Sequence, residues 1–136
     1  MKNSNVLKSI LFLSGLVASG IGAAILFAPL AFYASYGTVL DVDFSLLNEI
    51  RATGGAVLAS GLLIMSGAFV AKLAFTATLV SAFLYLPYGL SRVMSMAVDG
   101  MPAEGFIQAA VLELAIGLVC VFAFIKYQDK RAVAEH

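Results

Sequence analysis

The stretch Asn48-Glu49-Ile50-Arg51-Ala52-Thr53-Gly54-Gly55 stands at the head of a long apolar run. It brings together two opposite charges and a pair of glycines just where that run begins. Three other apolar segments surround it in the sequence, and two of them carry a charge of their own, Arg92 and Glu113. Charges inside apolar segments are costly in a membrane, so these residues are the first candidates for a site.

The composition excludes an ordinary soluble domain. Of the 136 residues, 62% are hydrophobic and 12% are charged, and the mean hydropathy is +1.01. Soluble domains carry about 25% charged residues, and a small domain needs them because most of it is surface. The apolar runs also approach or exceed the roughly 18 residues needed to cross hydrocarbon. The sequence therefore predicts a polytopic membrane protein in contact with the lipid bilayer.

The net charge and the small number of cysteine and histidine residues exclude several further classes of function. The formal net charge is zero, so nothing favours a nucleic-acid partner. Cys120 is the one cysteine and His136 the one histidine, which excludes an intramolecular disulfide and a site built on several cysteines or histidines. Glu49 and Glu113 are the remaining candidates for metal ligands, and the neighbouring arginines would repel a cation. We expect no metal, and no cofactor is evident.

Four transmembrane helices are expected, over residues 9–36, 45–71, 73–98 and 105–127. The predicted fold is an all-α four-helix transmembrane bundle that forms a single domain. Small residues recur at helical spacing on the first helix (Gly15, Ser19, Gly22) and on the second (Gly54, Gly61, Ala68). Such seams let helices approach closely, within one chain or in a homo-oligomer. Phe32, Tyr33 and Tyr36 are expected to form an aromatic cluster at the membrane interface.

The distribution of basic residues predicts the orientation. In a four-span arrangement one side carries most of the basic residues, namely Lys2, Lys8, Lys72, Lys126, Lys130 and Arg131. Because cytoplasmic loops are enriched in lysine and arginine, both termini are expected in the cytoplasm. The localisation predicted is a bacterial inner membrane.

The third segment presents a polar face to a protein or water environment. Ser81, Tyr85, Tyr88, Arg92, Ser95 and Asp99 recur every three or four residues, which places them on one side of a helix. Arg51, Arg92 and Glu113 fall at a similar depth from the non-cytoplasmic side, with Glu49 about one turn shallower. We predict that Glu113 pairs with Arg92 or Arg51. The binding candidates are therefore Asn48, Glu49, Arg51, Tyr85, Tyr88, Arg92, Asp99 and Glu113.

Three interpretations of this charged layer remain open. The charges could fix the register and orientation of the helices without any further function. They could instead bind the polar head of a small molecule whose apolar tail runs between the helices. Glu113 could also act as a catalytic acid or base, because a buried carboxyl beside tyrosines can have a pKa suited to proton transfer, whereas an arginine neighbour shifts it the other way.

The joint pattern resembles a family of small bacterial membrane proteins known as domain of unknown function 4345. The matching residues are Phe27-Ala28-Pro29, the 48–52 motif with Gly54-Gly55, Arg92-Val93-Met94-Ser95, Asp99-Gly100-Met101-Pro102 and Glu113. The resemblance implies a four-helix membrane protein and brings no activity. The chain is also distantly similar to DoxX-like membrane proteins, some of which are linked to quinone-dependent oxidation. That similarity makes a quinone the one cofactor worth considering.

Two classes of function follow as hypotheses. The leading one is a non-catalytic membrane protein that binds a lipid-like or quinone-like molecule, or a partner subunit, through a polar layer near the outer leaflet. The alternative is a small membrane enzyme or redox accessory subunit that uses Glu113 for proton transfer. Loss of turnover in Glu113→Gln with the fold intact would distinguish the second class from the first.

Overall fold

A computed structural model describes residues 4–41 and 43–134, with side chains described as far as Tyr127. Lys2 and His136 lie outside the described residues, as do the side chains of Lys130 and Arg131. The elements are α1 (Asn5–Phe27), α2 (Pro29–Ser35), α3 (Phe44–Phe69), the 3-10 turn η1 (Ala71–Leu73), α4 (Ala74–Asp99) and α5 (Glu104–Ala134). Within the described residues four helical spans are long and apolar enough to cross a membrane. The predicted all-α bundle is confirmed.

The first predicted helix is wrong in one respect, because it is two helices. A single helix over residues 9–36 was expected, whereas α1 ends at Phe27 and α2 begins at Pro29. Ala28 between them has φ −141° and ψ 59°, outside the helical region. The ring of a proline disfavours helical geometry in the residue before it, so Pro29 ends α1 and then serves as the first residue of α2. The chain consequently turns at this point.

The helices α1 and α3 pack closely along their length through small residues. A Cβ atom added to Gly15 would lie 2.5 Å from the backbone nitrogen of Met65. One added to Gly22 or Gly61 would also come closer than 3.0 Å to backbone of the facing helix. The predicted small-residue seams are therefore confirmed as the contact surface between these two helices.

The helices α4 and α5 pack through a reciprocal arrangement of glycine and leucine. Leu114 of α5 fills the space beside Gly89 of α4, where an added Cβ would lie 2.6 Å from its Cγ. Leu86 of α4 fills the space beside Gly117 of α5 in the same way, at 2.8 Å. A glycine of each helix thus packs against a leucine of the other helix, which fixes the register of the two helices.

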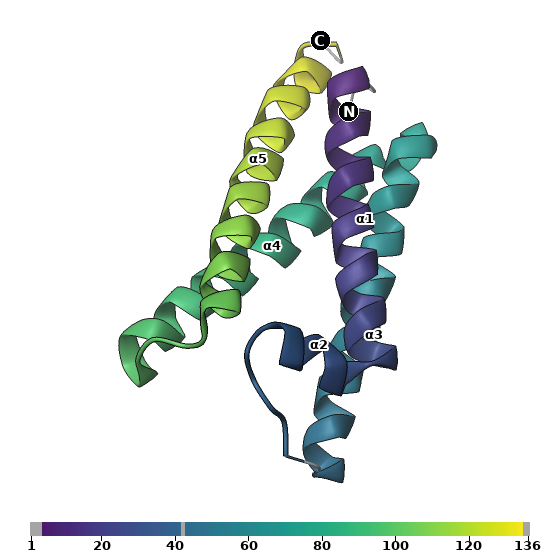
Figure 1. The fold of residues 1–136 in the computed structure, drawn as a ribbon. Coiled ribbons are helices and arrows are strands. Elements are labelled where there is room, and N and C mark those ends of the chain that lie inside the picture. The colour runs from purple at the N-terminus through teal and green to yellow at the C-terminus, as the bar shows by residue number, and fades with distance from the viewer. Residues whose placement is uncertain (1–3, 42, 135–136) are drawn as a thin grey trace.

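The two helix pairs meet at one end of the bundle and separate toward the other. The start of α1 and the end of α5 lie at the closed end (Figure 1), where the Ser4 hydroxyl donates to the Tyr127 hydroxyl at 2.7 Å. Leu7, Leu11 and Ile64 are fully buried there. At the opposite end α2 lies between the diverging pairs (Figure 1). This divergence creates room for the cavity described next.

Candidate functional site

A cavity of about 550 Å³ opens at the end of the bundle opposite the start of α1 and the end of α5. Residues from α1, α2, α3, α4 and α5 all line it, together with Tyr36, Thr38 and Pro102 from the connecting segments. Most of the lining is apolar, with Ile21, Ile25, Val57, Leu84, Ala109 and Leu112 among the contributing side chains. Ligand pockets in proteins occupy about 300–1,000 Å³ and have this mixture of many apolar and few polar groups.

Arg92 and Glu113 are the charged side chains among the described residues that line the cavity. The Nε atom of Arg92 donates to Oε2 of Glu113 at 2.8 Å, which links α4 to α5. Their side chains are 27% and 12% exposed. The prediction that Glu113 pairs with an arginine is confirmed, and the partner is Arg92. Within the described residues this is the one ion pair.

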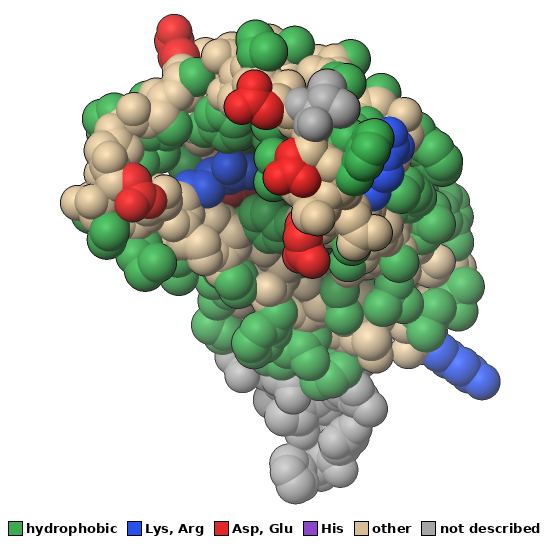
Figure 2. All heavy atoms as spheres, turned by 90° about the horizontal axis from the view of Figure 1, so that it is seen from below, with side chains coloured by type: hydrophobic (Ala, Val, Ile, Leu, Met, Phe, Trp, Pro, Cys, Tyr) green, Lys and Arg blue, Asp and Glu red, His purple; other side chains and the backbone are tan. Residues whose placement is uncertain are grey.

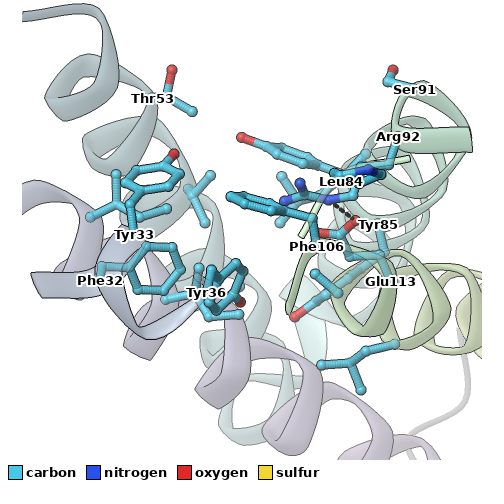
Figure 3. Close-up of a pocket in the computed structure, with 18 of the residues that line it drawn as sticks. Phe32, Tyr33, Tyr36, Thr53, Leu84, Tyr85, Ser91, Arg92, Phe106 and Glu113 are labelled. Atoms are coloured by element: carbon cyan, nitrogen blue, oxygen red, sulfur yellow. Dashed lines mark hydrogen bonds and ion pairs between the residues drawn. The ribbon is translucent and has the colours of Figure 1, made fainter. Parts of the chain in front are cut away.

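The guanidinium of Arg92 lies between two aromatic rings. Its Cζ atom is 5.9 Å from the centre of the Tyr88 ring and 5.8 Å from the centre of the Phe106 ring. A guanidinium positioned over the face of an aromatic ring is stabilised by cation–π attraction. Because the bond to Glu113 uses Nε, the two terminal amino groups are left facing the cavity, as Figure 3 shows. Neither donates to a protein acceptor within the described part of the chain.

Aromatic residues of α2 and of the turn that follows it form the opposite wall. Phe32, Tyr33 and Tyr36 lie across the cavity from Arg92, Phe106 and Glu113 (Figure 3). The Tyr36 and Phe106 rings meet edge to face with centres 5.2 Å apart, so the wall also contacts α5. Burial raises the pKa of Tyr33 and of Tyr36, and the positive charge of Arg92 opposes that rise. Both phenols are therefore neutral hydrogen-bonding groups at neutral pH.

Tyr85 closes the inner end of the cavity. Its side chain is buried and its hydroxyl donates to the backbone carbonyl of Ser14 on α1. Below it, Ser81 and Cys120 contact each other through Oγ and Sγ at 3.0 Å, and both are fully buried. These contacts give the buried hydroxyls of Tyr85 and Ser81 hydrogen-bonding partners, as burial requires. Cys120 is thus enclosed in the core.

The remaining sequence candidates lie outside the cavity. Arg51, the alternative partner for Glu113, instead donates from Nη1 to the carbonyl of Leu26 at 2.5 Å. That carbonyl belongs to the last turn of α1, where backbone acceptors lack helical partners. Asn48 and Glu49 are exposed on the first turns of α3. Asp99 is exposed and accepts from the Ser95 hydroxyl at 3.0 Å.

Sequence reasoning missed Phe106 as a member of the site. The signal that could have found it is spacing, because Phe106, Ala109 and Glu113 stand three and seven residues apart and so share one face of α5. Thr53 and the α2 aromatics line the cavity as well. The contribution of the aromatic residues depends on the turn at Ala28, which helical periodicity does not reveal.

At the open end of the bundle, acidic side chains lie on the surface and a basic side chain lies inside the cavity. Figure 2 views it directly and shows acidic side chains around the face, with a basic side chain set back inside a hollow. The basic residue that lines the cavity is Arg92. Among the described residues there is no group of three histidine, cysteine, aspartate or glutamate side chains arranged for a metal ion.

Comparison with known proteins gives one match. The family model described as a domain of unknown function, DUF4345, matches residues 6–124. No curated protein and no solved structure matches the chain.

Proposed function

The chain belongs to the family of the domain of unknown function DUF4345, and from the geometry of its cavity we propose that it binds a small amphipathic molecule within the membrane. The polar head of that molecule would lie against Arg92 and Glu113. Its apolar part would lie along the walls that α1 and α4 provide. Lipid-like and quinone-like molecules both belong to this class. The family description assigns no activity, so the proposal rests on the site alone.

The observation that carries the proposal is the position of Arg92. Its terminal amino groups face a cavity of about 550 Å³ instead of a protein acceptor. Because no protein acceptor engages them, these groups are free to donate to whatever occupies the cavity, water or a ligand head. The cavity walls around these amino groups are mainly apolar. A molecule with a polar head and an apolar body would therefore match both the donors and the walls, whereas water would match the donors alone.

A purely structural role for the ion pair accounts for less of what is seen. To hold α4 against α5, the pair would need only the bond from Nε to the carboxylate. It would not need an adjoining space with aromatic rings on both sides of the guanidinium and more rings across from it. The five helices also contribute to the same cavity, although α4 and α5 alone would suffice for a structural bond.

The test is to identify what co-purifies with the protein in mild detergent. Wild type and Ala109→Phe would be extracted and compared by mass spectrometry for lipids and other small apolar molecules. Ala109 is a buried residue of the cavity wall, so phenylalanine would occupy the ligand's space. Val111→Phe is the matched control, because Val111 is 66% exposed on the outer side of the same helix.

The proposal expects one compound to be enriched to near equimolar amounts in wild type and in Val111→Phe and to be lost in Ala109→Phe. If all three carry the same bulk lipid, the cavity holds no specific ligand and the proposal is wrong. A protein that co-purifies in place of a small molecule would instead favour a partner subunit.

A further inference from the structure

We infer that the cavity selects a ligand with an uncharged head group that accepts hydrogen bonds, and that Glu113 sets this selectivity. This inference rests on the proposed function and specifies the chemical class of the ligand. It concerns the head group alone, because the apolar walls would accept many kinds of tail.

The head group would meet a site with no net charge. Arg92 supplies one positive charge to the cavity and Glu113 one negative charge, and their bonded atoms are 2.8 Å apart. An anionic head on Arg92 would therefore bring a second negative charge close to the first, inside surroundings of low polarity. The attraction of Arg92 would be largely cancelled while the anion still lost its hydration. An uncharged acceptor avoids both costs.

The donors available to the ligand also specify its chemistry. A guanidinium has donors and no acceptor, and Nε is already bonded to Glu113. The head must therefore accept hydrogen bonds from the terminal amino groups, as a carbonyl or sulfonyl oxygen does. The rings of Tyr88 and Phe106 hold the guanidinium between them. This support fixes the plane of its donors and so favours a head whose acceptor lies in that plane.

The rim of the cavity favours the same selectivity. The exposed acidic residues of the described chain gather at this end of the bundle, where Figure 2 shows them around the hollow. They are Asp41, Asp43, Glu49, Asp99 and Glu104. Acidic side chains outnumber basic ones on this face (Figure 2). A surplus of negative charge disfavours the approach of anions, and salt weakens the effect. Anionic ligands would thus be disfavoured on the way in as well as at Arg92.

The test uses two probes that differ in charge and little else, hexadecyl methyl sulfone and hexadecane sulfonate. The sulfone is neutral, the sulfonate is anionic at every accessible pH, and a methyl group in one replaces an oxygen in the other. Binding of each to the full chain in mild detergent would be measured by native mass spectrometry. In wild type the sulfone is expected to bind at least about tenfold more tightly than the sulfonate.

Variants of the ion pair change the charge that the probes meet. Glu113→Gln leaves a site of net charge +1 and should reverse the preference, so that the sulfonate binds more tightly. The double variant R92Q/E113Q is neutral and lacks the guanidinium, and it should bind both probes weakly with little discrimination. Asn5→Lys is the charge-matched control, because it changes the charge by the same amount at an exposed position at the closed end of the bundle, away from the cavity and its rim. It should change the ratio of the two affinities by less than about twofold.

A second variant covers the case in which Glu113→Gln does not fold. Thr53→Lys adds a positive charge to the cavity wall from the exposed side of α3 and leaves the ion pair intact. It should shift the preference toward the sulfonate by about tenfold or more relative to wild type.

Each outcome has a distinct meaning. A wild type that prefers the sulfonate, or a Glu113→Gln variant that folds and keeps the wild-type preference, would overturn the selectivity inference. Equal binding of both probes to wild type would also overturn it, while binding in the cavity would stand if Ala109→Phe abolished it. If neither wild type nor any variant binds either probe, the proposed function fails together with the inference.

Discussion

Arg92 of α4 and Glu113 of α5 form a direct ion pair, with Nε and Oε2 2.8 Å apart. The pair joins two helices and at the same time supplies the charged part of the cavity wall. Stability and ligand binding therefore depend on the same two side chains. Variants of this pair must be judged by both measurements, because loss of binding alone would not distinguish an unfolded bundle from an empty site.

Removal of Glu113 alone should destabilise the bundle. In Glu113→Ala the guanidinium of Arg92 would keep its charge and lose its acceptor, and a hydrogen bond to a charged group is worth roughly 1.5–3 kcal/mol. The exposure of the Arg92 side chain, 27%, places the expected loss toward the lower end of that range. Thermal unfolding in detergent would measure it.

The control for this prediction replaces both partners. In R92M/E113L no charge is left unpaired, and apolar pairs of similar size often replace ion pairs at little cost. The double variant should therefore unfold at a higher temperature than Glu113→Ala. A Glu113→Ala variant that unfolds at the wild-type temperature would show that the pair contributes nothing to stability.

Two glycines of α1 should respond in opposite ways to the same substitution. A Cβ at Gly22 would come closer than 3.0 Å to the backbone of Leu58 on α3, so Gly22→Ala must push the helices apart. Overpacking of this kind costs about 1–3 kcal/mol. Nothing lies within 4 Å of a Cβ at Gly20, where alanine should be neutral or stabilise the helix by up to about 1 kcal/mol.

The same thermal unfolding measurement serves both variants. Gly20→Ala is the control for Gly22→Ala, since the substitution, the helix and the neighbouring sequence are shared. Similar unfolding temperatures for the two would contradict the packing of α1 on α3 described above.

The sequence was sufficient to predict the bundle and the pairing of Glu113, since both depend on local patterns. The apolar spans are read from composition, and the polar face with Tyr85, Tyr88 and Arg92 is read from helical spacing. A carboxylate in an apolar span requires a partner, and arginines at the same depth were the candidates. These predictions needed no knowledge of how the helices are arranged around one another.

The choice between the two arginines could not be predicted, because it depends on the end of α1. Ala28 leaves the helical region before Pro29, and the carbonyl of Leu26 accepts from Arg51. Arg51 is thereby engaged away from Glu113, which bonds to Arg92. The cavity could not be predicted either. It exists because the chain turns at Ala28 and brings the aromatic residues of α2 and of the turn after it opposite α5, a contact between segments far apart in the sequence.

The aromatic wall should make stability sensitive to alkaline pH. Burial raises the pKa of Tyr33 and of Tyr36 in the folded state above the value of about 10 that holds in the unfolded state. A group with a raised folded pKa contributes stability that is fully present below the unfolded pKa. That contribution is lost as pH rises through the folded pKa, because folding then has to hold a phenol neutral that would ionise in water.

The measurement compares wild type with the double variant Y33F/Y36F in thermal unfolding between pH 8 and 12. The two differ in these phenols and share the remaining tyrosines. The unfolding temperature of wild type should fall more steeply above about pH 10 than that of the variant. Parallel curves would mean that neither phenol is shielded from solvent by the cavity wall.

The orientation of the chain in the membrane can be tested with cysteines at the two ends of the bundle. Lys8, Lys72 and Lys126 belong to the end at which the chain terminates, and the enrichment of basic residues in cytoplasmic loops predicts that this end faces the cytoplasm. Val39, 91% exposed in the loop before α3, belongs to the other end. A membrane-impermeant maleimide added to intact cells should therefore label Val39→Cys.

The same reagent should label Lys72→Cys only after the membrane is permeabilised, because Lys72 lies exposed in η1 at the basic end. Wild type is the control, since Cys120 is fully buried and should not react in either condition. The reverse pattern, with Lys72→Cys labelled in intact cells and Val39→Cys protected, would place both termini outside. The cavity would then open toward the cytoplasm, and its ligand would have to reach it from the inner leaflet.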